Sequence, residues 1–246
     1  MNLMKIENGD NMKISIVTVT YNCENSITNT IESVLSQSYK NIEYIIIDGD
    51  SIDNTKSIIN KFQKKDSRIF FLSEPDKGIY NAMNKSINYL TGDYTIFLNS
   101  GDIFCNENII KDILKYLSTK KYDLVYGNII EKVSKKDKIL IEKMNLLLLF
   151  RAATICHQTI FFKSSRLKEN EFNETYKLCA DREWIYRAYK NNYKFLYCPV
   201  NIVYYDTTGV SSLESSKNQV DKERELILKH YYPVISILRK ILKLIR

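Results

Sequence analysis

Short apolar runs alternate with segments of helical spacing through the first hundred residues. The runs at 14–19, 44–47, 69–72 and 94–98 predict four strands. Between them, apolar residues recur three or four positions apart, which is typical of helices packed on one side. Because the runs are apolar throughout rather than alternating with polar residues, both faces of the sheet should be covered. The pattern predicts an α/β fold with a mainly parallel, Rossmann-like central sheet and helices on both faces.

The second half has a less regular pattern. A helix is expected from Asp181 to about Lys190, and short strands are expected near 124–133, 139–142, 159–162, 194–197 and 202–205. There is no internal repeat and no linker rich in glycine or proline. We therefore expect an N-terminal extension (1–12), one domain (13–215) and a C-terminal helical tail (216–246). The domain divides into a first half (13–102), which holds the regular pattern, and a second half (103–215).

Composition and charge narrow the functional class. With 44% apolar residues among 246, the chain can bury a large core. Its formal charge of +7 is concentrated in residues 217–246, which hold eight Lys or Arg and three Asp or Glu. A basic stripe with a recognition motif is missing from the body, so we expect no nucleic-acid partner. The longest apolar run, 146–150, is too short to cross a bilayer.

The cysteines and the tail bear on location. Five scattered cysteines without metal-ligand or redox spacing favour free thiols in a reducing cytoplasm. The tail sets eight apolar residues between 234 and 245 beside four basic ones, which predicts an amphipathic helix. Such a helix can lie in the headgroups of an anionic membrane, here at the inner face of the cell membrane. The alternative is a helix packed on the domain, or on a second subunit of a homodimer.

Polar residues follow each of the four predicted strands. These segments are Thr20-Tyr21-Asn22, the acidic loop at 48–55, the loop at 74–78, and Asn99-Ser100-Gly101-Asp102. The carboxyl ends of parallel strands share one edge of a sheet, where α/β proteins bind ligands. We therefore expect an aromatic ring, hydroxyls, a lysine and several carboxylates to meet at this edge.

These segments together resemble the family-2 glycosyltransferases of the GT-A fold, over about residues 13–206. The resemblance rests on SIVTVTYN at 15–22, DGxSxDxT at 48–55, SEPDKGIYNAMNK at 73–85 and FLNSGD at 97–102, in that order. The last two are similar to bacterial enzymes that build extracellular polysaccharide and O-antigen. The resemblance implies transfer of a sugar from a nucleotide-diphosphate donor, by base rate a UDP-sugar, to a hydroxyl of a glycan or lipid-linked saccharide. It also implies a divalent cation, Mn²⁺ or Mg²⁺, a nucleotide-sugar-binding half at 13–102 and an acceptor half at 103–215.

The resemblance also implies a donor site. Tyr21 would pack near the nucleobase, Asp48 would accept from the uracil or guanine edge, and Asp76 would help hold the nucleoside. Lys77 can meet phosphate, and His157 lies in a Cys-His-Gln stretch beside the donor site. The remaining donor-site candidates are Thr20, Asn22, Asp50, Asn99, Ser100 and Gly101.

Each assignment has a structural alternative. Tyr21 can be an ordinary rim aromatic, Asp48 a turn residue, Asp76 and Lys77 a solvated pair, and His157 a core histidine. We expect Asp53 and Thr55, also in the acidic loop, to be mostly structural, because short oxygen side chains cap helix N-termini.

The chemistry needs a cation for the departing diphosphate and a base for the acceptor hydroxyl. Asp102 is the expected metal ligand, although Asn99 and Gly101 stand where relatives often have acids. The resemblance places the base at Asp181, with Glu183 in reserve. A carboxylate at the start of a helix also favours the helix electrostatically without any catalytic role.

One base without a covalent nucleophile indicates a single displacement with inversion. Nucleophile-elbow, Walker and dinucleotide motifs are missing, which weakens hydrolase, kinase and dehydrogenase hypotheses. A nucleotidyltransferase would have a Gly-rich basic phosphate loop near the amino terminus, and this sequence has no such loop. The main rival is a catalytically inactive relative that binds a nucleotide-sugar or serves in assembly. It is favoured by the missing acids around Asp102 and by Met83, which replaces an arginine common in relatives.

Overall fold

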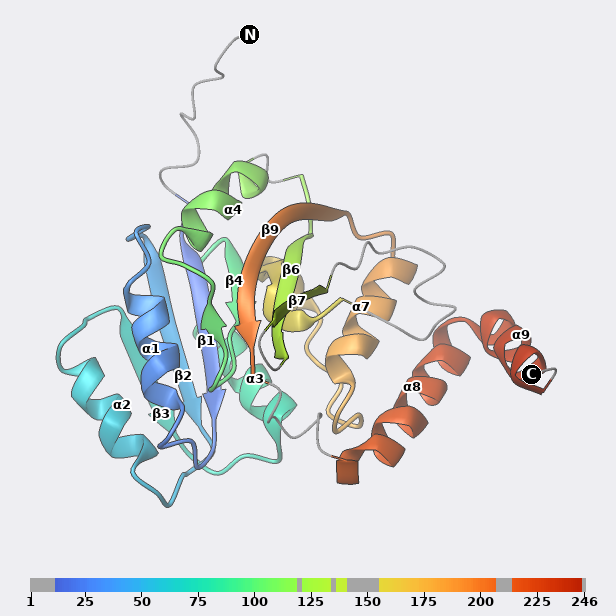
Figure 1. Cartoon of the computed structure of the whole chain (residues 1–246), viewed down its shortest axis with the longest axis horizontal. Coiled ribbons are helices and arrows are strands. Elements are labelled where there is room, and N and C mark those ends of the chain that lie inside the picture. Colours follow the sequence, from blue (N-terminus) through green and yellow to red (C-terminus); the bar gives the residue numbers. More distant parts are fainter. Residues whose placement is uncertain (1–11, 119–120, 134–135, 141–154, 207–213, 245–246) are drawn as a thin grey trace, which may run out of the picture.

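The computed structural model describes residues 12–118, 121–133, 136–140, 155–206 and 214–244. In this part of the chain the strands form one sheet in the order β3-β2-β1-β4-β8-β6-β9-β5, with β7 beside β6 (Figure 1). The strands are β1 (Ile14–Thr20), β2 (Ile42–Asp48), β3 (Ile69–Ser73), β4 (Tyr94–Phe97), β5 (Ile103–Phe104), β6 (Leu124–Val133), β7 (Lys136–Leu140), β8 (Ile160–Lys163) and β9 (Phe195–Tyr205). The helices are α1 (Ile27–Leu35), α2 (Thr55–Gln63), α3 (Ile79–Ile87), α4 (Ile109–Leu117), α6 (Ser164–Glu169), α7 (Ala180–Lys190), α8 (Lys217–Tyr231) and α9 (Pro233–Leu244).

The first four strands are parallel and covered on both faces, as predicted. Alternate residues of β1 point to opposite sides, so Ile14 and Ile16 join one core cluster and Val17 and Val19 join the other. The first cluster includes residues of α1, α2 and α4, and the second includes residues of α3 and α7. The predicted α/β fold with helices on both faces is confirmed.

The second half of the sheet mixes both pairing directions. β8 pairs antiparallel with β4 and with β6, whereas β6 and β9 are parallel. The segments predicted as two strands at 194–197 and 202–205 form the single strand β9, because a register shift opposite Asn128 absorbs the interruption around Pro199. Gly127 allows this irregularity, since a side chain there would collide with the carbonyl oxygen of Val200.

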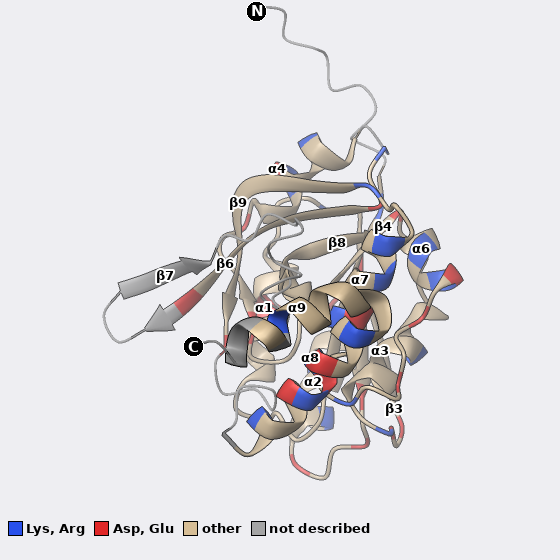
Figure 2. Ribbon diagram, turned by 90° about the vertical axis from the view of Figure 1, so that its right-hand side faces the viewer, with Lys and Arg blue, Asp and Glu red and all other residues tan. Residues whose placement is uncertain are grey.

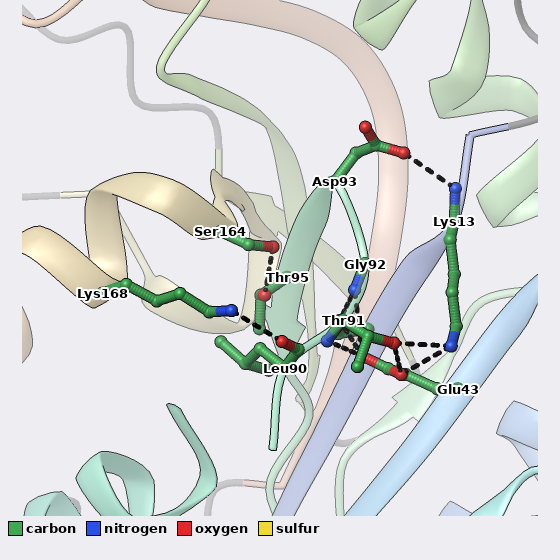
Figure 3. Close-up of polar contacts among 10 residues, drawn as sticks. Lys13, Glu43, Leu90, Thr91, Gly92, Asp93, Thr95, Ser164 and Lys168 are labelled. Carbon is green, nitrogen blue, oxygen red and sulfur yellow. Dashed lines mark hydrogen bonds and ion pairs between the residues drawn. The ribbon is translucent and has the colours of Figure 1, made fainter. Parts of the chain in front are cut away.

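A dense polar network joins the amino ends of the parallel strands (Figure 3). The Glu43 carboxylate accepts from the Ser15 hydroxyl at 2.5 Å and from the Thr91 N–H at 2.6 Å, and it pairs with the Lys13 ammonium at 2.8 Å. These donors outweigh burial, which alone would raise the pKa of Glu43, and they lower it to about 2. The neighbouring Gly92 has no room for a side chain, because its Cβ would lie 2.7 Å from the Ser15 backbone nitrogen. This end of the sheet is closed by its own side chains.

The C-terminal segment differs from the predicted single helix, because it forms α8 and α9 with a break at Tyr232. Pro233 explains the break: proline lacks an N–H and suits the first position of a helix. Val220, Ile227 and Leu228 of α8 are buried against α7. Figure 2 shows residues of both signs along α8.

The cysteines and the helices test the predicted thiol state and the predicted lack of a membrane span. All five cysteines lie within the described ranges and none forms a disulfide, which agrees with the predicted free thiols. Within those ranges, every helix is too short or too polar to cross a bilayer.

Candidate functional site

The loop after β2 is built around the buried carboxylate of Asp48. Asp48 is fully buried and accepts from the Ser51 N–H at 2.9 Å, from the Ser51 hydroxyl at 2.5 Å and from the Ser73 hydroxyl at 2.7 Å. These bonds fold the loop back and tie the end of β2 to the end of β3. The structural alternative for Asp48, a turn residue, therefore has direct geometric support.

Tyr21 and Asp76 offer accessible groups above this loop. The Tyr21 ring is 58% exposed, although it lies at the end of a fully buried strand. A methyl group at Gly49 would collide with Asp76 Oδ2 and lie 3.3 Å from Tyr21 Cδ2, so the ring and the carboxylate meet over this glycine. Asp76 also accepts from the Gly78 N–H at 2.8 Å. The edge thus presents a flat ring beside a carboxylate.

Asn22 and Asp50 make local contacts that hold the two loops in shape. Both adopt positive φ, of 51° and 65°. Asn22 Oδ1 accepts from the Ile52 N–H at 2.9 Å, and Asp50 forms a 2.8 Å ion pair with Lys56. Asp53 accepts from the Thr55 N–H at 2.9 Å at the start of α2, which is the capping role expected for it.

Three further candidates lie on the same edge. The Lys77 side chain is exposed, and its backbone N–H donates to Asn81 Oδ1 at 3.1 Å. The Ser100 hydroxyl lies 3.1 Å from that of Ser26. Thr20 Oγ1 is buried and lacks a hydrogen-bond partner among the described residues. An unpaired buried hydroxyl costs stability, so its position beside the exposed Tyr21 marks a place where a ligand can supply the partner.

Asp102 is a buried carboxylate beside Asp206, His157 and Gln158. It is 2% exposed, and its Oδ1 accepts from the Asp206 N–H at 2.9 Å. Burial raises the pKa of Asp102 to about 7, against the Asp206 N–H, His157 and the Gln158 side chain, which favour the charged form. The Asp206 side chain packs against Gly101, which has φ of 101° and no room for a Cβ. The carboxyl groups of Asp102, after β4, and Asp206, after β9, therefore lie close together.

Asp181 is held by two donors from other elements. Tyr80 of α3 donates its hydroxyl hydrogen to Asp181 Oδ1 at 2.8 Å, and His157 Nδ1 lies 2.8 Å from Oδ2. Burial alone would raise the pKa of Asp181, but the bonds to His157 and Tyr80 outweigh it and lower the value to about 2. The carboxylate is therefore ionised at neutral pH.

His157 connects this carboxylate to the end of β4. Because ionised Asp181 only accepts, the proton of a neutral imidazole stands on Nδ1. Nε2 then accepts from the Asn99 amide, with Nδ2 at 3.3 Å. The Asn99 carbonyl oxygen is buried without a hydrogen-bond partner in the described part of the chain. His157 and Gln158 are adjacent, and one contacts Asp181 while the other contacts Asp102, so these two aspartates converge on one region.

The structure gives other motif residues packing roles. Met83 is fully buried in the core, and Asn84 donates to the Phe172 carbonyl at 2.9 Å. The Lys85 ammonium pairs with Glu74 at 2.8 Å. Glu183, the reserve base, is 2% exposed and accepts from the Tyr231 hydroxyl of α8. Trp184 is buried and donates to the Asn170 carbonyl, which agrees with a core role.

Sequence reasoning missed three residues of this cluster: Tyr80, Gln158 and Asp206. Tyr80 and Gln158 lie inside the motifs that predict the site, beside Asn81 and His157. Asp206 directly follows β9 and meets Asp102 across 104 positions of sequence. No local pattern carries such a contact, because it depends on how β9 enters the sheet.

The fold and this edge place the chain among the GT-A glycosyltransferases. Residues 15–193 match the model of glycosyl transferase family 2, and the chain belongs to this family. It is 31% identical over 209 residues to the uncharacterized glycosyltransferase Rv1514c of Mycobacterium tuberculosis, covering 81% of this chain and 77% of Rv1514c. It is 42% identical over 116 residues to the UDP-Glc:alpha-D-GlcNAc-diphosphoundecaprenol beta-1,3-glucosyltransferase WfaP of Escherichia coli. That match spans 47% of this chain and less than half, 45%, of WfaP.

Solved structures share the fold. Staphylococcus aureus TarS 1-349 in complex with UDP-GlcNAc superposes with a TM-score of 0.70 at 19% identity, over 89% of this chain and 71% of TarS 1-349. The mannosyltransferase PcManGT of Pyrobaculum calidifontis, in complex with GDP-Man and Mn²⁺, gives a TM-score of 0.64 at 12% identity, over 93% of this chain and 74% of PcManGT. At these identities the likeness establishes the fold.

Proposed function

We propose that this protein is an inverting glycosyltransferase that moves a sugar from a nucleotide-diphosphate donor, favouring a UDP-sugar, to a hydroxyl of a glycan or lipid-linked saccharide. The product would enter cell-surface polysaccharide. The observation that carries the proposal is the convergence of Asp102 and Asp181 on the His157-Gln158 pair, at the edge where Tyr21 is exposed and Asp76 is half-buried. A bound UDP-GlcNAc in TarS and a bound GDP-Man in PcManGT support a donor of this class.

The nucleoside would bind at the Tyr21 ring. A base can stack on this exposed ring while its N–H groups reach a carboxylate. Asp76 offers such a carboxylate beside the ring, and buried Asp48 fixes the loop beneath it. Lys77, exposed on the same loop, would approach the phosphates.

Asp181 would accept the proton of the acceptor hydroxyl. As the acceptor oxygen bonds to the anomeric carbon, the bond from that carbon to the diphosphate oxygen breaks, and the carbon inverts. The bonds from Tyr80 and His157 hold the carboxylate in one orientation. A positioned base contributes roughly 10²–10⁴ to a rate.

Asp102 and Asp206 would hold a divalent cation. Within the described residues no group of three or more His, Cys, Asp or Glu is placed to bind a metal. Two neighbouring carboxyl groups nevertheless supply the oxygen ligands that Mg²⁺ and Mn²⁺ prefer, with phosphate and water completing the shell. When bound, the cation would neutralise charge on the departing diphosphate.

A test of this proposal measures release of UDP or GDP from a panel of nucleotide-sugars, with and without Mn²⁺. Thermal shift in the same panel reports binding, because a ligand of the native state raises its stability. We expect one donor class to raise the melting temperature and to be consumed faster when a saccharide acceptor is added. Binding without turnover under any condition would favour the inactive relative instead.

The acceptor would be presented at a membrane surface through α9. Val234, Ile237, Leu238 and Ile241 are exposed at spacings of three and four, which places them along one side of the helix. The sequence of α9 also contains Arg239, Lys240 and Lys243, and cations near a membrane surface are attracted to anionic headgroups. The diphosphoundecaprenol acceptor in the name of WfaP is also lipid-linked.

Co-sedimentation with anionic liposomes tests this membrane surface. The double variant Ile237→Ser and Ile241→Ser should lose most binding. Ile52→Ser, which removes an exposed isoleucine in the loop after β2, should keep liposome binding. Equal binding by both variants would reject the membrane role of α9.

A further inference from the structure

Glu223 of α8 binds the backbone that leads into α7. Its carboxylate accepts from the N–H groups of Lys177, Leu178 and Cys179, at 3.0, 2.9 and 2.9 Å. The Glu223 side chain is buried, and Gln219 donates to it at 3.0 Å. Three successive backbone donors on one carboxylate form a rigid turn, because charge-assisted hydrogen bonds are about twice as strong as neutral ones.

The start of α7 has no side-chain cap of its own. Cys179 occupies the N-cap position and makes no side-chain capping bond there. A negative charge near a helix N-terminus is favourable, so Glu223 supplies from α8 what the local sequence lacks. Figure 1 shows α7 and α8 side by side, and Val220, Ile227 and Leu228 fix their packing.

The segment before α7 is held at its other end by Glu174. This carboxylate accepts from the side-chain amides of Asn81 and Asn84 at 3.0 and 2.9 Å. Asn84 also exchanges hydrogen bonds with the backbone of Phe172. One carboxylate therefore ties residues 172–179 to α3 and another ties them to α8, and Asp181 follows directly.

We propose that Glu223 is a positioning residue for the base Asp181, so that α8 belongs to the catalytic unit. This inference rests on the proposed function. Asp181 stands in the first turn of α7, two residues beyond Cys179, and its bonds to Tyr80 and His157 depend on where that turn begins. A displacement of about 1 Å at a reacting group can cost about 10²-fold in rate.

The test compares Glu223→Gln with Glu225→Gln in the full chain. Glutamine keeps the shape of Glu223 but only one acceptor oxygen, so at least one of the three backbone donors loses its partner. Glu225, on the same helix, pairs with Arg239 of α9 at 2.7 Å and controls for a general loosening of the tail. For Glu223→Gln we expect kcat to fall about tenfold or more, with the donor KM within twofold. Glu225→Gln should leave both constants near those of the parent protein.

Two results would overturn the inference when the parent protein is active: an unchanged kcat in Glu223→Gln, or kcat and donor affinity falling together with the melting temperature. The second result would mean a purely structural role. If the parent protein transfers no sugar from any donor, the proposed function fails separately. Amide hydrogen exchange then decides the positioning: Glu223→Gln should speed exchange at 177–182 and leave 48–55 unchanged, and equal exchange at 177–182 would refute it.

Discussion

The two edges of the parallel strands carry buried polar groups in opposite states. At the amino edge, Glu43 is surrounded by donors that lower its pKa to about 2 despite burial. At the carboxyl edge, burial raises the pKa of Asp102 to about 7. Thr20 and Asn99 there keep buried oxygens without a partner in the described part of the chain. The donors around Glu43 satisfy that carboxylate internally, whereas the oxygens of Thr20 and Asn99 are left to be satisfied from outside.

This difference indicates that the buried groups of the amino edge support stability and that those of the carboxyl edge support function. Buried polar groups that are fully hydrogen-bonded support the fold, whereas unsatisfied or protonation-shifted groups destabilise it and cluster at functional sites. Substitutions at the amino edge should therefore change stability and spare activity. At the carboxyl edge, removing the buried charge of Asp102 should raise stability, and substituting Asp102 or Asp181 should reduce activity.

The largest effect is expected for Asp181→Asn. Asparagine cannot accept the hydroxyl proton, so kcat should fall by roughly 10²–10⁴. Donor affinity should stay within about threefold, because Tyr21 and Asp76 are untouched. Steady-state transfer assays and thermal shift with the donor check the two parts.

Asp112→Asn is the matched control for that substitution. Asp112 is a half-exposed carboxylate that also lies in the first turn of a helix, here α4, outside the site. Its variant should transfer sugar at the parent rate. If Asp181→Asn is also active, another group is the base, and His157 becomes the first residue to examine.

Asp102→Asn should stabilise the protein at pH 8 in the absence of divalent cations. The pKa of Asp102 is raised in the folded state. Its contribution to the free energy of unfolding is therefore fully present below the unfolded pKa of 3.8 and is lost as pH rises through the folded pKa of about 7. Asparagine never carries the buried charge, so the variant should be more stable by on the order of 4 kcal/mol at pH 8. The difference should shrink at pH 5, where folded Asp102 is protonated.

Thermal melts in EDTA at both pH values measure this difference. Transfer activity with Mn²⁺ should fall in the same variant, as expected where function costs stability. A variant that melts below the parent protein at pH 8 would show that the Asp102 charge is well solvated or paired, and it would remove the contrast between the edges.

The sequence predicted the parallel half of the fold because the signals there are local. Apolar runs and helical spacing define β1 to β4 and their helices, and the rim residues follow directly from strand direction. The prediction of two strands in place of β9 failed at Pro199, since a β-bulge depends on the partner strand β6. The amphipathic helix predicted after Pro233 is present as α9, but the tail predicted as one helix over 216–246 is divided at Pro233, because proline cannot continue a helix and suits its first position.

The candidate site was predictable in its residue types and less so in its contacts. Asp102, His157 and Asp181 were named from motifs, and the structure brings them together. The bond from Tyr80 to Asp181 spans 101 positions, and Glu223 reaches Cys179 across 44. Such contacts depend on helix packing, which hydrophobic periodicity alone does not specify.

The smallest effect is expected at the amino edge, for Glu43→Gln. Folded Glu43 has a lowered pKa, so its ionised form contributes stability above the unfolded value of 4.5, and this contribution is lost as pH falls toward 2. The free energy of unfolding of the variant should be about 2 kcal/mol lower than that of the parent protein at pH 7, since a hydrogen bond to a charged group contributes about 1.5–3 kcal/mol. This difference in the free energy of unfolding between the variant and the parent protein should become smaller below about pH 4.

Denaturant unfolding at pH 7 and pH 3.5 measures this loss, with Glu32→Gln, an exposed residue of α1, as control. Transfer per folded molecule should equal that of the parent protein, because the network of Glu43 lies at the edge opposite Asp102 and Asp181. A fall in kcat without a fall in stability would mean that Glu43 affects catalysis. The assignment of stability to the amino edge and of catalysis to the carboxyl edge would then be wrong.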